Sequence, residues 1–264
     1  MRVHIIIPAR YASTRYPGKP LAELTLPDGT RKPLIRLSWE AAGQVAGVAA
    51  VHVATDDARI AEVARGFGAG VIMTDPDCAN GTERCAQALE RAGLEADIVI
   101  DFQGDAPLAP PWFAEALVDE MTRDSSVAVA TPVLRCDTRA LEQLRADRRA
   151  GRVGGTTAVF GADRNALYFS KEVIPYTGEG TGEAGMTPVY HHVGLYAFRP
   201  DALGRYAGWA PGALERLEGL EQLRFLEHGC AVRCVPVEAR GRDFWELNNP
   251  GDVALIEAAL RRGT

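Results

Sequence analysis

Residues 5–21 read IIIPARYASTRYPGKPL, an apolar run that leads into a loop with three basic side chains. The apolar run Val3–Ile7 predicts a buried strand. Arg10, Arg15 and Lys19 follow it on one loop. Arginine can donate two hydrogen bonds to phosphate oxygens and lysine adds a point charge, so the loop suits a triphosphate. A solvated basic loop is the alternative interpretation. The loop is not a Walker P-loop, because it lacks the GxxxxGK[ST] frame. It also lacks a GxGxxG turn, which disfavours a nicotinamide-linked oxidoreductase.

Strand-like and helix-like patterns alternate after this loop, which predicts an α/β fold with a mostly parallel central sheet. The expected strands are 51–54, 71–73, 98–102, 127–133, 166–169, 190–198 and 232–237. The expected helices are 34–45, one that starts at Asp56 or Asp57, 82–89, 214–226 and 252–260. Residues 137–157 are polar and rich in arginine, and we expect a loop or lobe boundary there. The glycine-rich stretch 178–185 predicts a mobile loop.

The composition argues against several classes of protein. The chain has 264 residues, 47% of them hydrophobic, enough for a full core. Its formal net charge of -6 disfavours nucleic-acid binding through a general basic surface. No run approaches the roughly 18 apolar residues of a membrane span, and the N-terminus lacks the pattern of a secretory signal. We therefore expect a cytoplasmic protein with neither nucleic acid nor membrane as a partner. Five cysteines without zinc-ligand spacing predict reduced thiols.

A polar turn follows the buried strand expected at 98–102. Gln103, Gly104 and Asp105 come directly after it, at the carboxyl end where open α/β sheets bind ligands. A carboxylate there is a natural ligand for Mg²⁺ facing phosphate oxygens. Asp105 is therefore the first candidate metal ligand, with a turn-forming aspartate as the alternative.

The segment at 5–21 resembles the signature of the 3-deoxy-manno-octulosonate (Kdo) cytidylyltransferases, also called CMP-Kdo synthetases. The resemblance spans nearly the whole chain in family order, through ATDD at 54–57, GTER at 81–84, QGD at 103–105, ALYFS at 166–170, HVGLY at 192–196 and LEQLR at 220–224. It implies a Rossmann-like nucleotidyltransferase fold, with helices flanking the sheet and a smaller lobe for sugar binding and dimerisation. Within a single domain, residues 1–135 would bind nucleotide, 136–230 would form the acceptor-binding lobe and 231–264 would return to the core.

The resemblance also implies the activity and the residues that carry it. The enzyme would join CMP from CTP to a Kdo-like 3-deoxy-2-ulosonic acid, with Mg²⁺ as cofactor and pyrophosphate as product, for lipopolysaccharide or capsule biosynthesis. The nucleotide-binding candidates are Pro8, Ala9, Arg10, Ser13, Arg15, Lys19, Gly81, Thr82 and Arg84, of which Arg10 and Lys19 are catalytic together with Asp105. The acceptor-binding candidates are Gln103, Lys171, His192, Tyr196, Glu218 and Gln222. The metal ligands would be Asp105 and Asn248, and the chain would be a homodimer.

Several candidates have plainer interpretations. Thr82 can be only a helix cap, and His192 only a core residue with its hydrogen bonds satisfied. If 214–226 is one helix, Glu218 and Gln222 lie four residues apart on one face, which leaves Glu221 a solvated or structural role. The sequence assigns no general base.

Departures from the family pattern keep other functions open. Asn248 stands where a VDTPED-like block carries aspartate, Ala106 replaces a glutamate, Asn80 a serine and Lys171 an arginine. The run RVGGTT at 152–157 replaces an Asn-Pro-Asn-x-Val-Lys segment, so a lysine is missing there. The alternatives are therefore a cytidylyltransferase for 8-amino-Kdo, a nonulosonic acid or a phosphonate, and a catalytically silent nucleotide-binding relative.

Overall fold

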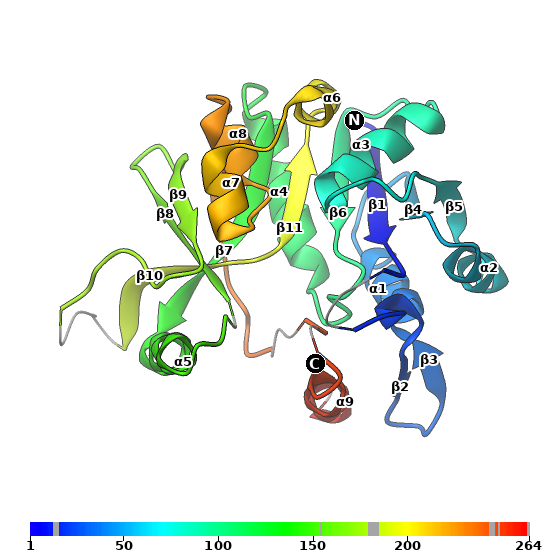
Figure 1. Ribbon diagram of the computed structural model, residues 1–264, viewed down its shortest axis with the longest axis horizontal. Coiled ribbons are helices and arrows are strands. Elements are labelled where there is room, and N and C mark those ends of the chain that lie inside the picture. Colours follow the sequence, from blue (N-terminus) through cyan, green and yellow to red (C-terminus); the bar gives the residue numbers. More distant parts are fainter. Residues whose placement is uncertain (13–15, 154, 179–184, 243–245, 248, 263–264) are drawn as a thin grey trace.

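The computed structural model describes residues 1–264 except 13–15, 154, 179–184, 243–245, 248 and 263–264. Ten described strands form one mixed sheet in the order β5-β4-β1-β6-β11-β7-β10-β8-β9, and β12 also pairs with β7 (Figure 1). They are β1 (Val3–Ala9), β4 (Ala50–Thr55), β5 (Gly70–Met73), β6 (Ile98–Phe102), β7 (Val129–Asp137), β8 (Thr156–Phe160), β9 (Ala166–Ser170), β10 (Met186–His192), β11 (Leu195–Phe198) and β12 (Arg233–Val237). A separate hairpin is made by β2 (Glu23–Thr25) and β3 (Arg31–Pro33).

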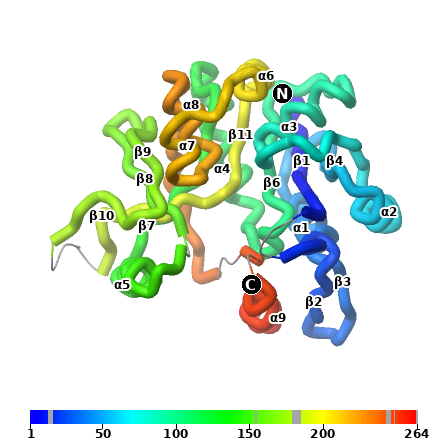
Figure 2. Tube along the Cα trace, viewed as in Figure 1, coloured from blue at the N-terminus to red at the C-terminus, as the bar shows by residue number. Residues whose placement is uncertain are grey.

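The sheet has a parallel part and an antiparallel part. Strands β5, β4, β1 and β6 run parallel, which confirms the predicted parallel core. Strand β11 then pairs antiparallel with both β6 and β7, and β10, β8 and β9 continue antiparallel beyond it. Figure 2 shows the result: the blue and cyan segments lie at one end of the sheet and β8, β9 and β10 at the other. The division at residues 135 and 230 stays a prediction.

Helices cover both faces of the sheet, which explains why the run at 5–7 in β1 is apolar without alternation. Ile5 and Ile7 pack in a core with α1 (Leu34–Ala42), α2 (Ala58–Gly66) and α4 (Pro111–Arg123). Ile6 faces the opposite core, with α3 (Gly81–Arg91), α6 (Pro200–Gly208) and α8 (Leu223–Glu227). All three isoleucines are fully buried. This packing fixes the direction of β1 and hence the place where its basic loop begins.

The C-terminal helix α9 (Asp252–Arg262) returns to the first half of the chain, beside β2. Its Ile256 and Ala259 share a small core with Leu24 and Leu34, and Glu257 accepts a hydrogen bond from the backbone of Thr25 at 2.7 Å. A helix at 252–260 is therefore confirmed. Among the described residues no helix has both the length and the apolar character needed to cross a membrane.

Residues 137–157 are not a loop, because α5 (Thr138–Arg149) occupies most of them, and the alternative of a lobe boundary there stays a prediction. The carboxylate of Asp137 caps this helix by accepting from the backbone N–H of Ala140 at 2.7 Å. Only Leu141 and Leu144 are buried along it. Two buried leucines among many arginines are too few apolar positions for the helical periodicity to be recognised in the sequence.

The single strand expected at 190–198 is also wrong. The chain makes two strands, β10 and β11, separated at Val193 and Gly194. The backbone N–H of Leu195 bonds to the carbonyl of Val193 at 2.8 Å, which turns the chain between them. Consequently β10 lies in the outer antiparallel part while β11 enters the middle of the sheet.

The single helix expected at 214–226 is wrong as well. The segment forms α7 (Ala213–Glu218) and α8, separated by Gly219 in the left-handed conformation with φ of 61°. Left-handed glycine is a usual end of a helix, because a side chain there would be strained. Glu218 and Gln222 therefore do not share one helix face.

Candidate active site

The basic loop folds back towards the sheet and delivers Lys19 to Asp105. The backbone N–H of Gly18 donates to the carbonyl of Tyr11 at 2.9 Å, closing the loop, and Gly18 takes a left-handed φ of 69°. Lys19 then lies 2.5 Å from the Asp105 carboxylate, measured from Nζ to Oδ2. Both side chains are mostly buried. Two predicted catalytic residues from distant parts of the sequence thus form an ion pair at the carboxyl ends of β1 and β6.

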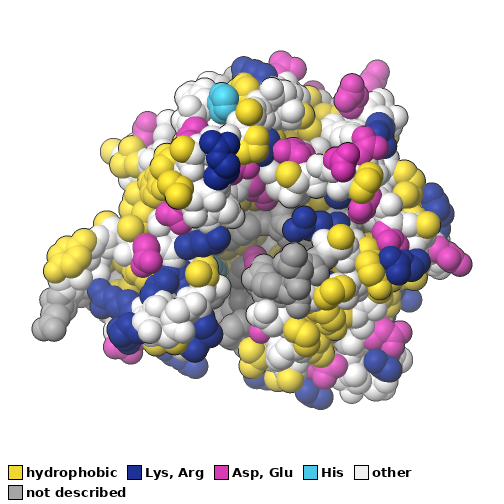
Figure 3. Space-filling model, viewed as in Figure 1, with side chains coloured by type: hydrophobic (Ala, Val, Ile, Leu, Met, Phe, Trp, Pro, Cys, Tyr) yellow, Lys and Arg dark blue, Asp and Glu magenta, His cyan; other side chains and the backbone are white. Residues whose placement is uncertain are grey.

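The positions of the other loop candidates are partly described. Pro8 and Ala9 close β1, with Ala9 buried and Pro8 half-buried, and Arg10 is exposed just beyond them. Ser13 and Arg15 lie outside the described residues. The space-filling view is hollowed between the two halves of the molecule, and Lys and Arg side chains border the hollow on both sides (Figure 3). The protein as a whole carries a negative net charge, so a local border of basic side chains is needed to attract anionic substrates.

Two glycines let the predicted blocks touch. A Cβ on Gly104 would lie 2.9 Å from the carbonyl oxygen of Pro8, and one on Gly81 would lie 3.3 Å from Pro8 Cγ and 3.2 Å from Gln103 Nε2. Ser38 further fixes the turn after β6 by donating to the carbonyl of Gly104 at 2.9 Å. The ends of β1 and β6 and the start of α3 therefore meet at one point, as ligand binding at this edge requires.

Two side chains cap the start of α3. The Asn80 side chain accepts from the backbone N–H of Glu83 at 2.9 Å, so Asn80, and not Thr82, is the side-chain cap. The backbone N–H of Thr82 donates to a carboxylate oxygen of Glu221 at 3.0 Å. Glu221 thus has a structural contact, one of the two roles expected for it. The Thr82 hydroxyl is buried without a hydrogen-bond partner among the described residues.

The Arg84 side chain is buried beneath this turn and is not exposed to solvent. It donates to the Thr74 hydroxyl at 2.5 Å and lies 3.4 Å from the Asp56 carboxylate. These contacts tie α3 to the ends of β4 and β5. A direct contact of Arg84 with nucleotide stays a prediction.

Three acceptor candidates form one buried cluster. His192 Nε2 lies 2.9 Å from the Thr131 hydroxyl, and the Tyr196 hydroxyl donates to Gln222 Oε1 at 3.0 Å. The rings of His192 and Tyr196 are 5.6 Å apart. Burial, with a smaller contribution from His191, lowers the pKa of His192 from 6.5 to about 3, so its imidazole is neutral at pH 7. Gln222 Nε2 is buried and has no hydrogen-bond partner among the described residues.

Glu218 and Lys171 form a second group, next to β9. The Glu218 carboxylate accepts from the Ser170 hydroxyl at 2.7 Å and from the backbone N–H of Lys171 at 2.9 Å. A Cβ on Gly219 would lie 2.9 Å from the Lys171 ammonium nitrogen. The two acceptor groups therefore come from β9, β10 and β11 together with the break between α7 and α8.

Asp101 is a site residue that the sequence reasoning did not single out. It is fully buried on β6, and its Oδ1 accepts from Gln103 Nε2 at 2.9 Å while Oδ2 has no hydrogen-bond partner among the described residues. Burial, then the nearby charges of Glu221 and Asp105, raise the pKa of Asp101 well above its usual 3.8. The available signal was one aspartate in the otherwise apolar strand Ile98–Phe102. Asp101 orients Gln103, an acceptor candidate.

The residues at the end of β6 fit a magnesium ion. No group of three or more His, Cys, Asp or Glu side chains in the described part of the chain has the arrangement of a metal site. Mg²⁺, however, typically takes only one or two carboxylates and completes its shell with substrate phosphates and water. Asp105 offers such a carboxylate beside the basic loop. Asn248 lies outside the described residues, but the backbone N–H of its neighbour Leu247 donates to the carbonyl of Asp105 at 2.9 Å.

Comparison with known proteins agrees with this architecture. The cytidylyltransferase family model matches residues 4–233. The 3-deoxy-manno-octulosonate cytidylyltransferase of Maricaulis maris is 42% identical, over 98% of this chain and 97% of that protein. The 8-amino-3,8-dideoxy-manno-octulosonate cytidylyltransferase of Shewanella woodyi is 38% identical, over 98% and 99%. A solved CMP:2-keto-3-deoxy-manno-octonic acid synthetase complexed with CTP has a TM-score of 0.84 and 34% identity, with both chains fully covered. Because relatives at 42% and 34% identity match 98% and 100% of its length, this chain belongs to the 3-deoxy-manno-octulosonate cytidylyltransferase family.

Proposed function

We propose that this chain transfers CMP from CTP to Kdo or a close 3-deoxy-2-ulosonic acid and releases pyrophosphate. The observation that carries the proposal is the meeting of the Lys19 loop, Asp105 and the Gly81 turn at one edge of the sheet. The names of the relatives at 42% and 34% identity support this choice of substrates.

In the proposed reaction, the anomeric hydroxyl of the sugar acid attacks the α-phosphorus of CTP. A new P–O bond forms, the bond from that phosphorus to the bridging oxygen breaks, and pyrophosphate leaves with the electron pair. The hydroxyl proton passes to solvent, since no described side chain is assigned as general base. Arg10 and Lys19 would offset the charge that develops on the leaving pyrophosphate, and would also reduce repulsion between the acid and the triphosphate. Ser13 and Arg15 would extend this phosphate site.

We propose Mg²⁺ as the cofactor, held by Asp105 and Asn248. The ion would supply positive charge to the phosphate oxygens in the bound complex. The Asp105 carboxylate supports this assignment by its position, and the Leu247 hydrogen bond supports the inclusion of Asn248. Lys19 compensates the Asp105 charge when the site holds no cation, and its flexible stem allows it to turn towards phosphate when substrate arrives.

The base and the acceptor would bind on opposite sides of the Gln103 turn. Pro8, Ala9, Gly81 and Thr82 would lie against the nucleoside. The acceptor candidates would surround the polyhydroxylated acid from the other side, where Gln103, Tyr196 and Gln222 provide donors and acceptors for hydroxyl groups. A neutral His192 would take part as a hydrogen-bonding group and not as a charge.

The experiment is an acceptor screen with CTP and Mg²⁺, in which pyrophosphate is measured and the CMP-sugar is identified by mass. We expect product with Kdo. Absence of pyrophosphate release with Kdo, 8-amino-Kdo, nonulosonic acids and phosphonates would contradict the proposal and favour a silent nucleotide-binding relative. Product with 8-amino-Kdo alone would support the second candidate acceptor, which is the acceptor in the name of the Shewanella woodyi relative.

We further propose a cytoplasmic homodimer that serves lipopolysaccharide or capsule synthesis, since CTP is a cytoplasmic nucleotide. Leu167 on β9 is 69% exposed and Tyr176, in the segment after β9, is 94% exposed, and a partner chain would cover such apolar side chains. Light scattering tests the dimer: it should give about 57 kDa, twice the 28.4 kDa of one chain.

A further inference from the structure

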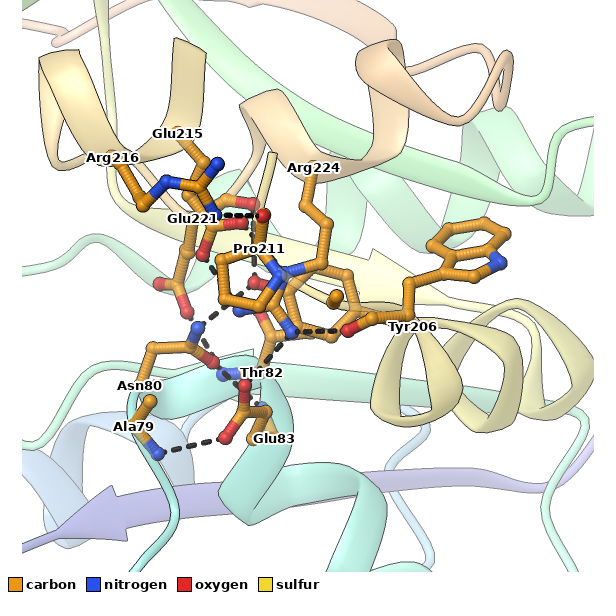
Figure 4. Close-up of polar contacts among 12 residues, drawn as sticks. Ala79, Asn80, Thr82, Glu83, Tyr206, Pro211, Glu215, Arg216, Glu221 and Arg224 are labelled. Atoms are coloured by element: carbon orange, nitrogen blue, oxygen red, sulfur yellow. Dashed lines mark hydrogen bonds and ion pairs between the residues drawn. The ribbon is translucent and has the colours of Figure 1, made fainter. Parts of the chain in front are cut away.

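A buried arginine lies between the two substrate-binding parts of the proposed site. Arg224 on α8 is only 1% exposed. Its Nε and Nη2 each donate at 2.7 Å to one of the two carboxylate oxygens of Glu215 on α7, and its Nη1 donates at 2.8 Å to Glu83 on α3. The guanidinium carbon also lies 4.2 Å from the centre of the Tyr206 ring (Figure 4). One side chain thus joins α3, α6, α7 and α8.

Glu83 and Tyr206, which contact Arg224, also form hydrogen bonds with the turn before α3. The second carboxylate oxygen of Glu83 accepts from the backbone N–H of Ala79 at 2.7 Å. Asn80 Nδ2 donates to the Tyr206 hydroxyl at 2.9 Å, and that hydroxyl donates to the carbonyl of Glu221 at 3.2 Å. We call the contacts Glu83–Arg224, Asn80–Tyr206 and Thr82–Glu221 the bridge. Each joins residues 79–83 to residues 206–224.

The two ends of the bridge carry different substrate candidates. Residues 79–83 include Gly81 and Thr82, which we assign to the nucleotide. Residues 206–224 include Glu218 and Gln222, which we assign to the acceptor. Glu218 ends α7 and Gln222 precedes α8, so Glu215 and Arg224 flank both of them. A shift of the bridge would therefore move the acceptor candidates relative to the nucleotide turn.

Stability alone gives a weak reason for such a charged cluster. A buried ion pair costs much desolvation, and well-packed apolar residues of similar volume are often as stabilising or more so. The ion pairs instead fix the relative orientation of the helices. The Arg224 guanidinium makes its two hydrogen bonds to the Glu215 carboxylate only when the two groups lie in one plane, and its third contact, to Glu83, then has a fixed angle. The bridge therefore defines a unique spacing between its two ends.

We propose that Arg224 is a positioning residue that sets this spacing and thereby couples the binding of CTP to the binding of the sugar acid. The inference rests on the proposed function. Binding of nucleotide against Gly81 and Thr82 steadies the turn, and the bridge transmits that order to Glu218 and Gln222. The second substrate then binds to a segment that is already arranged, which lowers its entropic cost.

The test measures the dissociation constant of Kdo by calorimetry, with and without the non-cleavable α,β-methylene analogue of CTP and Mg²⁺. For the unaltered protein we expect the analogue to tighten Kdo binding by roughly fivefold or more, the lower range of site-to-site coupling. Arg224→Lys keeps the charge but loses the planar fork, so its single nitrogen cannot reproduce the contacts that three arginine nitrogens make with Glu215 and Glu83. We therefore expect the coupling to fall towards onefold. Its kcat should fall while the affinity for the CTP analogue alone changes little.

Tyr206→Phe is a second variant in case Arg224→Lys does not fold. It removes one contact of the bridge, Asn80–Tyr206, together with the hydrogen bond from the Tyr206 hydroxyl to the Glu221 carbonyl, and it preserves the buried ring. It should reduce the coupling partially. The matched controls are Arg216→Lys, an exposed arginine on α7, and Tyr190→Phe, which packs against Phe160 on the outer part of the sheet. Both should keep the full coupling.

Full coupling in either folded bridge variant, or none in the unaltered protein, would overturn the inference. If Arg224→Lys does not fold, Tyr206→Phe decides alone. Failure of the proposed function is a separate result: the unaltered protein would then release no pyrophosphate with any acceptor of the screen. A protein that turns over Kdo but shows equal coupling in all variants contradicts only the role of Arg224.

Discussion

The Lys19–Asp105 pair places opposite charges where a metal triphosphate would bind, so its two members have different expected effects. In the proposed site, Asp105 would supply a negative charge to Mg²⁺ and Lys19 would supply a positive charge to phosphate. We predict that Asp105→Asn lowers kcat/KM about 10²- to 10³-fold, the usual loss for one electrostatic contact in a transition state. The measurement is pyrophosphate release at a series of Mg²⁺ concentrations.

The control for Asp105→Asn is Asp119→Asn on α4, which removes the same charge from an exposed side chain. It should leave turnover unchanged. Circular dichroism should show the same fold for both variants, because asparagine has nearly the same size as aspartate and leaves no cavity. A rate close to that of the unaltered protein for Asp105→Asn would place the metal elsewhere.

Asn248 gives the proposed metal site one negative charge fewer than a pair of aspartates. We predict that Asn248→Asp lowers the Mg²⁺ concentration for half-maximal activity severalfold, because affinity for hard cations rises with the charge of the ligand set. Asn249→Asp is the matched control, since it adds the same charge one residue farther along. Equal Mg²⁺ dependence in both variants and the unaltered protein would remove Asn248 from the metal site.

Some of these residues are accessible to sequence reasoning and others are not. Lys19 and Asp105 follow recognisable strands, so the edge of the sheet where they meet could be predicted. The roles of Asp101 and Arg224 could not, because a polar residue in an apolar strand and an arginine on an amphipathic helix look the same whether solvated or buried. Only the three-dimensional contacts distinguish these cases.

At the scale of elements, the break between α7 and α8 sets where Glu218 and Gln222 point. We predict that Gly219→Ala destabilises the protein by about 1–2 kcal/mol, the cost of a side chain in a left-handed backbone conformation. Gly204→Ala on α6 is the control, because Gly204 has a helical backbone and open space around its Cα. That change should be neutral or stabilising by about 0.4–1 kcal/mol.

Urea unfolding of the two glycine variants provides the comparison. Gly219→Ala should also weaken Kdo binding, whereas Gly204→Ala should not. If alanine is tolerated equally at both positions, the left-handed turn is not needed and one continuous helix becomes admissible. The case also shows why this element was mispredicted: glycine inside a helical pattern is compatible with either a weak helix or a break.

Most parallel strands and the closing helix could be predicted because buried apolar runs and amphipathic stripes repeat regularly. The elements of the outer part could not be predicted as well. Helix α5 buries only two leucines, and the split of β10 from β11 depends on strand partners that are distant in sequence. Long-range pairing of this kind leaves little trace in local periodicity.

At the scale of the whole molecule, we assign phosphate chemistry to the parallel part of the sheet and the choice of acceptor to the antiparallel part. Strand β11 joins the two, since it pairs with β6 on one side and β7 on the other. Tyr196 on β11 and Gln103 after β6 therefore keep a fixed relation. A change of acceptor would then require changes only around β9, β10 and the break between α7 and α8, where Lys171 replaces the usual arginine.

The last prediction concerns that choice. An 8-amino acceptor carries a positive charge near neutral pH and needs a free carboxylate, whereas Glu218 already accepts hydrogen bonds from Ser170 and Lys171. The Lys171 ammonium would also repel it. We therefore predict that kcat/KM for Kdo exceeds that for 8-amino-Kdo by about tenfold, equivalent to about 1.4 kcal/mol, and that a nonulosonic acid reacts more slowly still.

Lys171→Met tests the electrostatic part of this argument, because it removes the charge and keeps an unbranched side chain. It should reduce the preference for Kdo over 8-amino-Kdo severalfold, mainly by improving use of the amino acceptor. Lys32→Met is the control, since Lys32 pairs with Glu40 far from the acceptor groups. This variant should leave the preference unchanged.

Faster turnover of 8-amino-Kdo by the unaltered protein would make the amino sugar the acceptor. Preference for the nine-carbon acid would refute both assignments. An unchanged preference in Lys171→Met would instead move the discrimination to Tyr196 and Gln222, two uncharged acceptor candidates joined by a hydrogen bond at 3.0 Å.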